Sequence, residues 1–374
     1  MHIAVDGREF VSGRTTGIAR YLESLLSPLA SDPNISIHIL ASDPQAVPLS
    51  LTADNTSIET IPPSCTLTQD CFLLPRMAKR LNTDVFFSPY YKAPMHGSFR
   101  RITTIHDIMF LRLSTTHPLK RLLISLRLRM SVARSDIILV DSDFTGKDLA
   151  AFAPHAANKS ITVYPQLPQS WSSSDNLQDP QETRTTYSDG QPFLLYVGNF
   201  KPHKNVDKLI EAFAGLDRTN LPCQPKLILA GGDSLHQKHI EQTICRANIA
   251  DNVTVLRDVS DHDLRNLYHA ADWFITASSY EGFGYPPVEA MAMGCPVICH
   301  PNTSLKEIAA NAGLQIPSLA TEDISATIHK ALLLPQSERT ALIAAGRQKS
   351  ATFSSNNSST IFRNALQSLA NNPD

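Results

Sequence analysis

The chain has 374 residues, of which 42% are hydrophobic and 18% are charged, a composition typical of globular proteins. This length exceeds what one ordinary hydrophobic core organises, so two domains are expected. A formal net charge of −2 argues against a protein that binds nucleic acid through a strongly basic surface, although basic residues slightly outnumber acidic ones before residue 165.

Cysteine spacing and the hydropathy pattern exclude several other classes. The six cysteines are scattered without a Cys-x-x-Cys pair, which indicates reduced thiols rather than a disulfide framework or a zinc site. The first residues, from Met1 to Glu9, reach charged positions too early for a signal peptide. No apolar run approaches the ~20 residues that cross a bilayer. We therefore expect a cytoplasmic protein without a metal ion, either soluble or peripheral to a membrane.

The first 165 residues alternate between short apolar strands and helices. Residues 3–5 predict a buried strand, and a loop with Gly13 and Gly17 leads into a helical pattern that starts at Ile18. The loop lacks the Gly-x-Gly-x-x-Gly spacing, so it is either a tight turn or a phosphate-facing loop. Further strands are predicted at residues 35–40, 85–88, 102–106, 137–141 and 161–164. This alternation is typical of a parallel, doubly wound α/β sheet.

A basic helix is predicted between Arg112 and Ser135, a span with six Lys/Arg and no acidic residue. Lys120, Arg127 and Arg134 recur on one side of this helix, opposite an apolar stripe. The stripe consists of Leu119, Leu122, Leu123, Leu126, Met130 and Ala133. Such a helix either exposes its charged face to water or contacts anionic lipid headgroups or a phosphorylated acceptor.

The pattern changes at residues 166–191, which contain few apolar side chains and predict a linker. Asn205 is expected to cap one later helix, and Ser260 with Asp263 another. The strands predicted beyond the linker are residues 193–197, 227–230, 253–256, 273–277 and 296–300. The predicted organisation is an N-terminal domain over residues 1–165, a linker over 166–191, a C-terminal domain over 192–353 and a final helix over 354–374.

Residues that could do chemistry follow several of the predicted strands, where ligands bind to open α/β sheets. His106 suits either a ligand contact or a hydrogen-bonded loop residue, and Asp107 suits either a ligand contact or a helix cap. Lys201 and Lys204 lie beside a helix start, where they could balance a diphosphate or serve only as surface charge.

Glu281 and Glu289 bracket a glycine-containing corner between a strand and a short helix. Two prolines at the helix start and Gly294 just past its end define that helix. Backbone N–H groups at such a start carry a partial positive charge, which favours an anion or the polar edge of a sugar. Glu289 in the first helical turn could also serve only to compensate the helix dipole.

Four segments resemble the retaining glycosyltransferases of family 4, which have the GT-B fold. Two of them are GNFKPHKN at residues 198–205 and EGFGYPPVEAMAMGCPVI at residues 281–298, where Glu281 and Glu289 form a Glu-x7-Glu signature. The others, GIARY at residues 17–21 and TIHD at residues 104–107, are similar to N-domain signatures of bacterial mannosyltransferase-like members. The similarity runs through most of the chain in the expected order.

The resemblance implies a fold and a donor site. The fold would consist of two Rossmann-like domains facing a cleft, with the final helix crossing back onto the N-terminal domain. A sugar-nucleotide donor would be held mainly by the C-terminal domain, without a metal ion or other cofactor. Glu289 would bind the ribose, Glu281 the sugar and Lys204 the diphosphate. The other implied donor contacts are Gly17, Gly198, Asn199, Lys201, Gly282, Phe283 and Gly284.

The resemblance also implies a reaction. His106 would lie beside the transferred sugar and Asp107 near the acceptor, so that His106, Asp107, Lys204 and Glu281 are the candidate catalytic residues. The implied activity is hexosyl transfer with retention, with GDP-mannose favoured over UDP-sugars, to a glycan or lipid-linked acceptor. It would serve cell-envelope polysaccharide synthesis, such as that of lipopolysaccharide, in the cytoplasm or at the inner face of the plasma membrane.

Two alternatives to a transferase remain, and the sequence departs from the family in two places. A sugar-nucleotide epimerase of the same fold would need no acceptor, and a catalytically idle protein would bind the nucleotide as a scaffold. Asn199 or His203 stands where a basic residue is common in the family, and residues 354–355 lack the aromatic side chain common at the start of the last helix. The sequence does not predict the oligomeric state.

Overall fold

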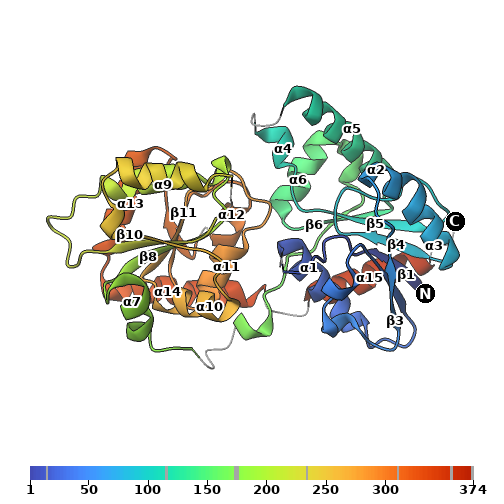
Figure 1. The fold of residues 1–374 in the computed structure, drawn as a ribbon, viewed down its shortest axis with the longest axis horizontal. Helices are drawn as coiled ribbons and strands as arrows, with labels where there is room; N and C mark the ends of the chain where they lie inside the picture. Colours follow the sequence, from blue (N-terminus) through green and yellow to red (C-terminus); the bar gives the residue numbers. More distant parts are fainter. Residues whose placement is uncertain are drawn as a thin grey trace. The chain divides into compact units, whose positions relative to one another are not determined.

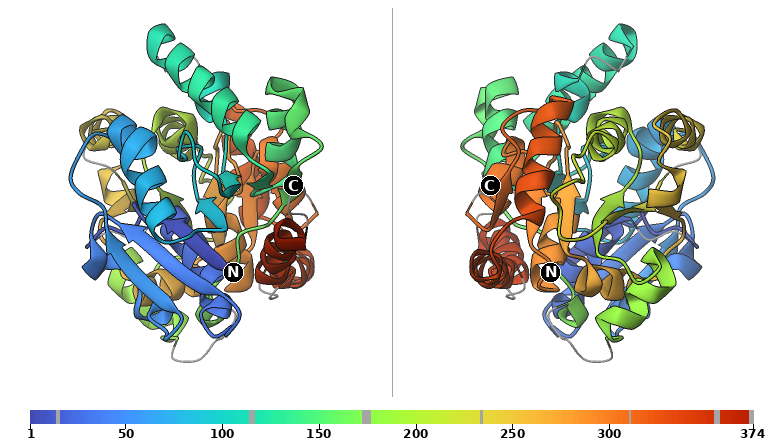
Figure 2. Two further views of the ribbon diagram at one scale, coloured as in Figure 1. Left: turned by 90° about the vertical axis from the view of Figure 1, so that its right-hand side faces the viewer. Right: turned by 90° about the vertical axis from the view of Figure 1, so that its left-hand side faces the viewer.

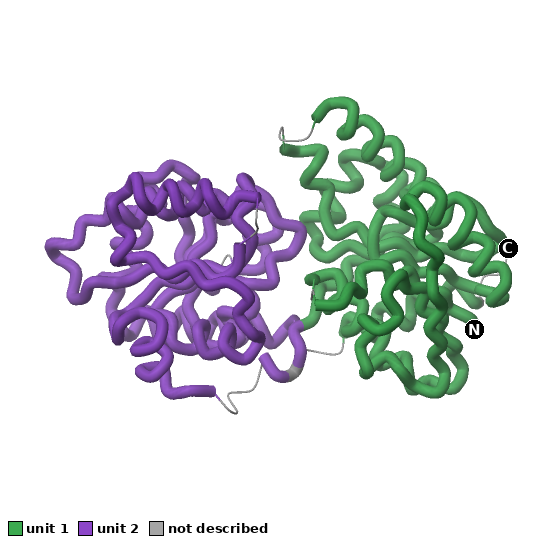
Figure 3. Tube along the Cα trace, viewed as in Figure 1, with its two compact units in different colours: residues 1–166, 355–374 green, residues 167–354 purple. Residues whose placement is uncertain are grey.

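The fold is known from a computed structural model that describes residues 1–13, 16–113, 117–171, 177–232, 235–309, 311–353 and 357–371. The chain divides into two compact units, coloured separately in Figure 3. Unit 1 comprises residues 1–166 and 355–374, and unit 2 comprises residues 167–354. Each unit has one parallel sheet with helices on its faces (Figure 1).

Unit 1 contains a seven-stranded sheet in the order β3-β2-β1-β4-β5-β6-β7. The strands are β1 (His2–Asp6), β2 (Ser36–Ala41), β3 (Thr56–Thr60), β4 (Val85–Ser88), β5 (Arg100–Ile105), β6 (Ile137–Val140) and β7 (Ser160–Thr162). The central strands are apolar and buried because helices cover both faces of the sheet. The order reverses between β1 and β4, which places the topological switch point of unit 1 there.

The helices of unit 1 include one from the far end of the chain. They are α1 (Gly17–Leu26), α2 (Thr66–Thr68), α3 (Leu74–Arg80), α4 (Met109–Arg112), α5 (Pro118–Arg134), α6 (Asp143–Phe152) and α15 (Asn357–Asn371), with a π-helical turn η4 (Gln69–Leu73) between α2 and α3. On α15, Phe362 is buried with its ring 4.7 Å from that of Phe87, and Arg363 pairs with Asp32. The last helix therefore completes the core of unit 1.

Helix α5 lies the other way round from what an amphipathic pattern leads one to expect. Its buried residues are Leu128, Ser131 and Val132, whereas every member of the predicted apolar stripe is exposed. Arg127, assigned to the charged side, is only 24% exposed and pairs with the buried Asp70 of η4. A buried ion pair thus holds the inner face of α5, and the predicted apolar stripe is exposed on its outer face. Figure 2 shows this helix in teal.

Unit 2 contains a six-stranded parallel sheet in the order β10-β9-β8-β11-β12-β13. Its switch point lies between β8 and β11. The strands are β8 (Phe193–Gly198), β9 (Lys226–Gly231), β10 (Val253–Leu256), β11 (Trp273–Thr276), β12 (Val297–Cys299) and β13 (Gly313–Gln315). The helices are α7 (Pro180–Ser188), α8 (Val206–Ala214), α9 (Gln237–Arg246), α10 (Asp261–Ala270), α11 (Tyr285–Ala292), α12 (Thr303–Ala309), α13 (Thr321–Leu332) and α14 (Gln336–Ala351).

Part of the predicted linker is structured, which corrects that prediction. Residues 180–188 form α7, which packs on α10, and Trp171 is fully buried with its ring 5.8 Å from that of Tyr268. Arg184 of α7 donates to the carbonyl of Ala270 and pairs with Asp272. These contacts are mostly polar, so a shortage of apolar residues in the sequence did not reveal them. Residues 172–176 lie outside the described part of the chain.

Candidate active site

The loop after β8 is tied to the loop after β11, its neighbour across the switch point of unit 2. Asn205 has a φ of +50°, and its side-chain amide donates to the carbonyl of Ala277 at 2.7 Å. It makes no side-chain cap to α8, so the predicted capping role is wrong, although Ser260 does cap α10 as predicted. The backbone N–H of Ser279 donates to the carbonyl of His203 at 2.8 Å. The two loops therefore form one surface.

An ion pair between Lys204 and Glu281 joins the same two loops. The Lys204 Nζ and Glu281 Oε1 atoms lie 2.5 Å apart, and each side chain is 16% exposed. Lys204 follows β8 and Glu281 follows β11, 77 positions apart in the chain. Because both charges are partly shielded from water, each interacts more strongly with a charged or polar ligand than it would on an open surface.

The second glutamate lies deeper than the first. Glu289 is 3% exposed, and its Oε2 atom accepts a hydrogen bond from the hydroxyl of Tyr268 at 2.9 Å. The corner between the two glutamates needs a glycine at position 284, where φ is +103° and a side chain would approach Leu305 to 3.1 Å. The hydroxyl of Ser304 lies within hydrogen-bond distance of the carbonyls of Glu281 and Phe283, which fixes this corner to α12.

The basic character of the site comes from lysines and not from His203. Burial, followed by the charge of Lys204, lowers the pKa of His203 to about 4. His203 is therefore neutral near pH 7, and the positive charges on this loop are those of Lys204 and the exposed Lys201.

In unit 1, His106 lies between groups from the two neighbouring strand ends. Its Nδ1 atom is 2.6 Å from Asp141 Oδ2, after β6, and its Nε2 atom is 2.7 Å from the Pro89 carbonyl, after β4. Both partners offer acceptor oxygens, so the geometry suits an imidazolium ring that donates from both nitrogens. Burial opposes this charge, but the Asp141 carboxylate outweighs burial and raises the pKa of His106 above its usual value.

The remaining residues predicted in unit 1 have structural contacts of their own. The Asp107 carboxylate accepts from the backbone N–H of Met109 at 2.9 Å, so it supports the start of α4. Gly17 is the first residue of α1, whose N-terminus is capped by Thr16. Arg14 and Thr15 of the preceding loop lie outside the described residues.

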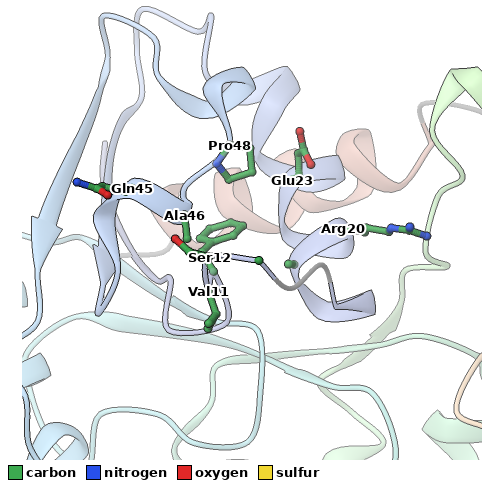
Figure 4. Close-up of a pocket in the computed structure, with 10 residues that line it drawn as sticks. Val11, Ser12, Arg20, Glu23, Gln45, Ala46 and Pro48 are labelled. Atoms are coloured by element: carbon green, nitrogen blue, oxygen red, sulfur yellow. The ribbon is translucent and has the colours of Figure 1, made fainter. Parts of the chain in front are cut away.

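A pocket of about 360 Å³ lies beside α1, at the carboxyl ends of β1 and β2. Figure 4 shows Glu23 and Pro48 near one another at this pocket, with Ser12 and Ala46 below them and Arg20 extending away. Its lining combines apolar and hydrogen-bonding side chains, as sites for small polar molecules do. No local pattern in the sequence predicts this pocket, because its walls come from α1 and from two segments that are separate from it in the chain.

The structure brings the predicted residues together in two groups. Lys204, Glu281 and Glu289 gather around the switch point of unit 2, together with the predicted backbone contacts of residues 198–201 and 282–284. His106 and Asp107 lie in unit 1, at the end of β5. Two partners were not predicted, Asp141 for His106 and Tyr268 for Glu289. The only available signal was that Asp141 is the last residue of a predicted strand.

The described residues contain neither a group of metal ligands nor a membrane-spanning helix. In that part of the chain, no three His, Cys, Asp or Glu side chains are grouped so as to hold a metal ion. Among the helices described, none combines the length and the apolar character needed to span a bilayer.

The comparisons with known proteins agree with the geometry. A family model described as "Glycosyl transferases group 1" matches residues 179–349. O-antigen chain mannosyltransferase B of Escherichia coli is 30% identical over 289 residues, which are 76% of this chain and 74% of that protein. O-antigen chain mannosyltransferase RfbU of Salmonella typhimurium is 30% identical over 189 residues, 50% of this chain and 49% of its own length.

Solved structures with the same fold cover nearly the whole chain. Sucrose-phosphate synthase from Thermosynechococcus elongatus superimposes with a TM-score of 0.80 at 18% identity, covering 99% of this chain and 100% of that one. HepE from Anabaena, in complex with UDP and glucose, gives a TM-score of 0.77 at 17% identity, covering 98% and 99%. The predicted pair of Rossmann-like domains and the predicted transferase class are confirmed. The chain belongs to the group 1 glycosyltransferases of the GT-B fold, and it is a hexosyltransferase.

Proposed function

We propose that this enzyme transfers mannose from GDP-mannose, with retention of configuration, to a glycan or lipid-linked acceptor in cell-envelope polysaccharide synthesis. Two relatives described as O-antigen chain mannosyltransferases support the choice of sugar and of pathway. The complex of HepE with UDP and glucose supports a nucleotide-sugar donor in this fold. We favour GDP over UDP as the nucleotide because the chain resembles bacterial mannosyltransferases, for which GDP-mannose is the expected donor.

The Lys204–Glu281 pair is the observation that carries the proposal. When the bond between the sugar and the diphosphate breaks, negative charge develops on the leaving phosphate, and Lys204 is a cation able to stabilise it. Glu281 can accept a hydrogen bond from a sugar hydroxyl. A donor with a phosphate beside Lys204 and a hydroxyl beside Glu281 satisfies both charges. We propose that no metal ion takes part, and that Lys201 supplies the second positive charge.

The buried Glu289 fits a different part of the donor. Its carboxylate is fixed by Tyr268, so it can offer an oriented acceptor to the two hydroxyls of a ribose. Pro286 and Pro287 have no N–H groups, so the donors available at this helix start are mainly those of the glycine-containing turn before it. We propose that Glu289 recognises the ribose while residues 282–284 contact the sugar or its phosphate.

On the acceptor side, we propose that unit 1 contributes His106 beside the transferred sugar and Asp107 near the acceptor. The imidazolium of His106 is a hydrogen-bond donor on both nitrogens, and its partners are already in place. Its contribution is therefore a fixed positive charge and a fixed backbone at the end of β5 rather than a proton exchanged in each turnover. The pocket beside α1 is our candidate for binding an acceptor sugar.

We propose that the enzyme works in the cytoplasm and touches the inner face of the plasma membrane. The support is the basic character of α5, which has no acidic residue, together with its outward leucines. An acceptor linked to a lipid would be presented at the same surface.

A transfer assay with purified protein tests the donor and the site together. GDP is expected to raise the melting temperature more than UDP, since a ligand that binds only the folded state stabilises it. Lys204→Ala and Glu281→Ala are each expected to reduce transfer by about 10²–10³-fold with the fold intact. Lys238→Ala, at an exposed position of α9, is the matched control and should retain full activity.

The outcomes separate this proposal from the alternatives. Full activity in both site variants would exclude the proposed role of the ion pair. An epimerised sugar formed from the donor alone would identify an epimerase instead. Tight donor binding without turnover on any envelope acceptor would identify a scaffold. Stabilisation by UDP and not by GDP would reject GDP-mannose while leaving the transferase intact.

A further inference from the structure

The outer face of α5 is a large apolar surface. Five of its residues are exposed: Leu119 60%, Leu122 54%, Leu123 60%, Leu126 49% and Met130 38%. They repeat at intervals of three and four residues, so they form one continuous stripe on the helix. Figure 2 shows α5 (teal) projecting beyond the other elements of unit 1. An apolar face of this kind is normally covered by a partner or a lipid surface.

A hollow lined by arginines adjoins this stripe. Arg101, Arg127 and Arg134 line it together with Met130, and Met130 also belongs to the stripe. No carboxylate is among its lining residues, which otherwise are Tyr91, Ala93, Pro94, Met95 and Ser131. Its volume of about 10 Å³ accommodates one oxygen-sized atom. A phosphate would therefore enter by a single oxygen and leave its remaining oxygens at the exposed Arg134.

The charges around the hollow are not balanced by nearby carboxylates. Asp70 is shared between Arg127 and Arg8, and Arg8 is also paired with Asp6. Asp136 accepts from the Arg100 side chain and from the Arg101 backbone. In this network, five guanidinium groups, those of residues 8, 100, 101, 127 and 134, interact with four carboxylates, those of residues 6, 9, 70 and 136. An anion at the hollow would reduce the excess positive charge.

The hydrogen bonding and the pKa of Arg101 support the same conclusion. Two of its nitrogens donate to the carbonyls of Phe99 and Gly97, while its buried Nε atom has no hydrogen-bond partner among the described residues. Burial lowers the pKa of Arg101; the Asp136 carboxylate opposes this, and Arg134 lowers the pKa further. Burial with the charge of Arg8 lowers the pKa of Arg127. Keeping both guanidinium groups charged in this partly buried place therefore costs free energy, and an anionic ligand would reduce that cost.

We propose that α5 and the arginine hollow together dock the protein on an anionic phospholipid membrane. One headgroup phosphate places an oxygen between Arg101, Arg127 and Arg134, and the leucine stripe lies against the acyl chains. Apolar contact and attraction to anionic lipid act together in such a helix, because the basic residues flank the apolar ones. This inference rests on the membrane location proposed above, but it concerns binding and is independent of the sugar transferred.

Sedimentation of the full-length protein with vesicles tests the proposal. Vesicles of phosphatidylcholine with phosphatidylglycerol are compared with vesicles of phosphatidylcholine alone, at low salt, where attraction is strongest. The double variant Leu122→Glu/Leu126→Glu is expected to lose at least about tenfold in affinity for the anionic vesicles. Arg134→Gln is expected to lose about fivefold on anionic vesicles and little on neutral ones.

Matched controls use similar exposed positions in unit 2. Leu235→Glu changes a leucine that is 81% exposed, and Lys238→Gln removes an exposed cation. Both variants should bind vesicles as the parent protein does. Because every substitution is at an exposed position, equal melting temperatures across the set would show that the fold is retained. Vesicle binding is measured without donor, so loss of binding and loss of transfer are scored separately.

Three outcomes would overturn the proposal. Equal binding of the parent protein to neutral and anionic vesicles would exclude the headgroup site. Inorganic phosphate that stabilises the parent but not Arg134→Gln, without vesicle binding, would assign the hollow to free phosphate. A change from a larger species to a monomer in the leucine variant, again without vesicle binding, would assign the stripe to contact with a second copy of the chain.

Discussion

The charge on His106 makes the stability of unit 1 depend on pH. Its pKa is raised in the folded protein, so the stabilisation it provides is complete below the ordinary value of about 6.5 and is lost as pH rises through the folded value. The free energy of unfolding should fall with rising pH more steeply in the parent protein than in His106→Gln. Denaturant unfolding at a series of pH values above about 6.5 measures this difference.

Asp141→Asn provides the control for this prediction. The carboxylate is the cause of the raised pKa, and without it burial favours the neutral ring. The pH dependence attributed to His106 should disappear in this variant as well, even though the histidine is intact. Parallel pH profiles for the parent protein, His106→Gln and Asp141→Asn would show that the histidine is neutral in the folded state.

Tyr268 holds the Glu289 carboxylate that we propose binds the ribose. Its hydroxyl donates to the buried Glu289 carboxylate, so Tyr268→Phe removes a hydrogen bond to a charged group. Such bonds contribute about 1.5–3 kcal/mol, and about tenfold weaker GDP binding is expected. With 2′,3′-dideoxy-GDP, which lacks the ribose hydroxyls, the parent and the variant should bind equally. Calorimetry with both ligands checks this, and an equal loss for both nucleotides would mean that Tyr268 acts only on stability.

The site could be predicted only in part, because some of its contacts join residues from distant segments of the chain. Lys204, Glu281 and Glu289 lie within recognisable local segments, and the loops that hold them follow strands in the expected way. Tyr268 and Asp141 act through contacts made after folding, the first between α10 and α11 and the second between neighbouring strand ends. No spacing in the sequence records these pairs, because the partners belong to different segments of the chain.

At the scale of elements, the close approach of β8 and β9 depends on one glycine. Gly231 has a φ of +117°, and an added Cβ would lie 2.5 Å from the Gly198 carbonyl oxygen. Gly231→Ala should therefore destabilise the protein by more than about 3 kcal/mol, since both the backbone conformation and the contact are unfavourable. Chemical denaturation measures the loss.

Gly146→Ala is the matched control for Gly231→Ala. This glycine lies inside α6, where an added Cβ meets only a methyl group of Val140 at 3.4 Å. Alanine should stabilise that helix by about 0.5–1 kcal/mol, because it restricts the unfolded chain. Equal effects of the two substitutions would contradict the close approach inferred between the sheet strands.

Strands were predictable where apolar residues run continuously in the sequence and were missed where they do not. Strands β4 and β10 match the predicted bounds, because apolar runs mark them clearly. The edge strand β3 has Ile58 as its only large apolar side chain, and β13 is three residues long, so neither gave a signal. Helix α5 was found, but its orientation was not, because hydrophobic periodicity defines a face without stating what covers it.

At the scale of the molecule, the chain leaves unit 1, builds unit 2 and returns. One buried cluster of unit 1 combines residues between 3 and 163 with Phe362, Ala365 and Leu366 of α15, and a buried cluster of unit 2 lies within residues 194–331. A unit that has its own hydrophobic core can be stable independently of its neighbour. The last helix should therefore determine the stability of the first strands and have little effect on those of unit 2.

Phe362→Ala tests this division. Loss of a fully buried phenylalanine costs about 3–5 kcal/mol, so amide hydrogen exchange in β1 and β4 should accelerate by at least about 100-fold. Exchange in β8 and β11 should change little. Phe213→Ala, which removes an equally buried ring from unit 2, should give the opposite pattern. Accelerated exchange in both sheets for either variant would mean that the two units unfold as one, despite their separate cores.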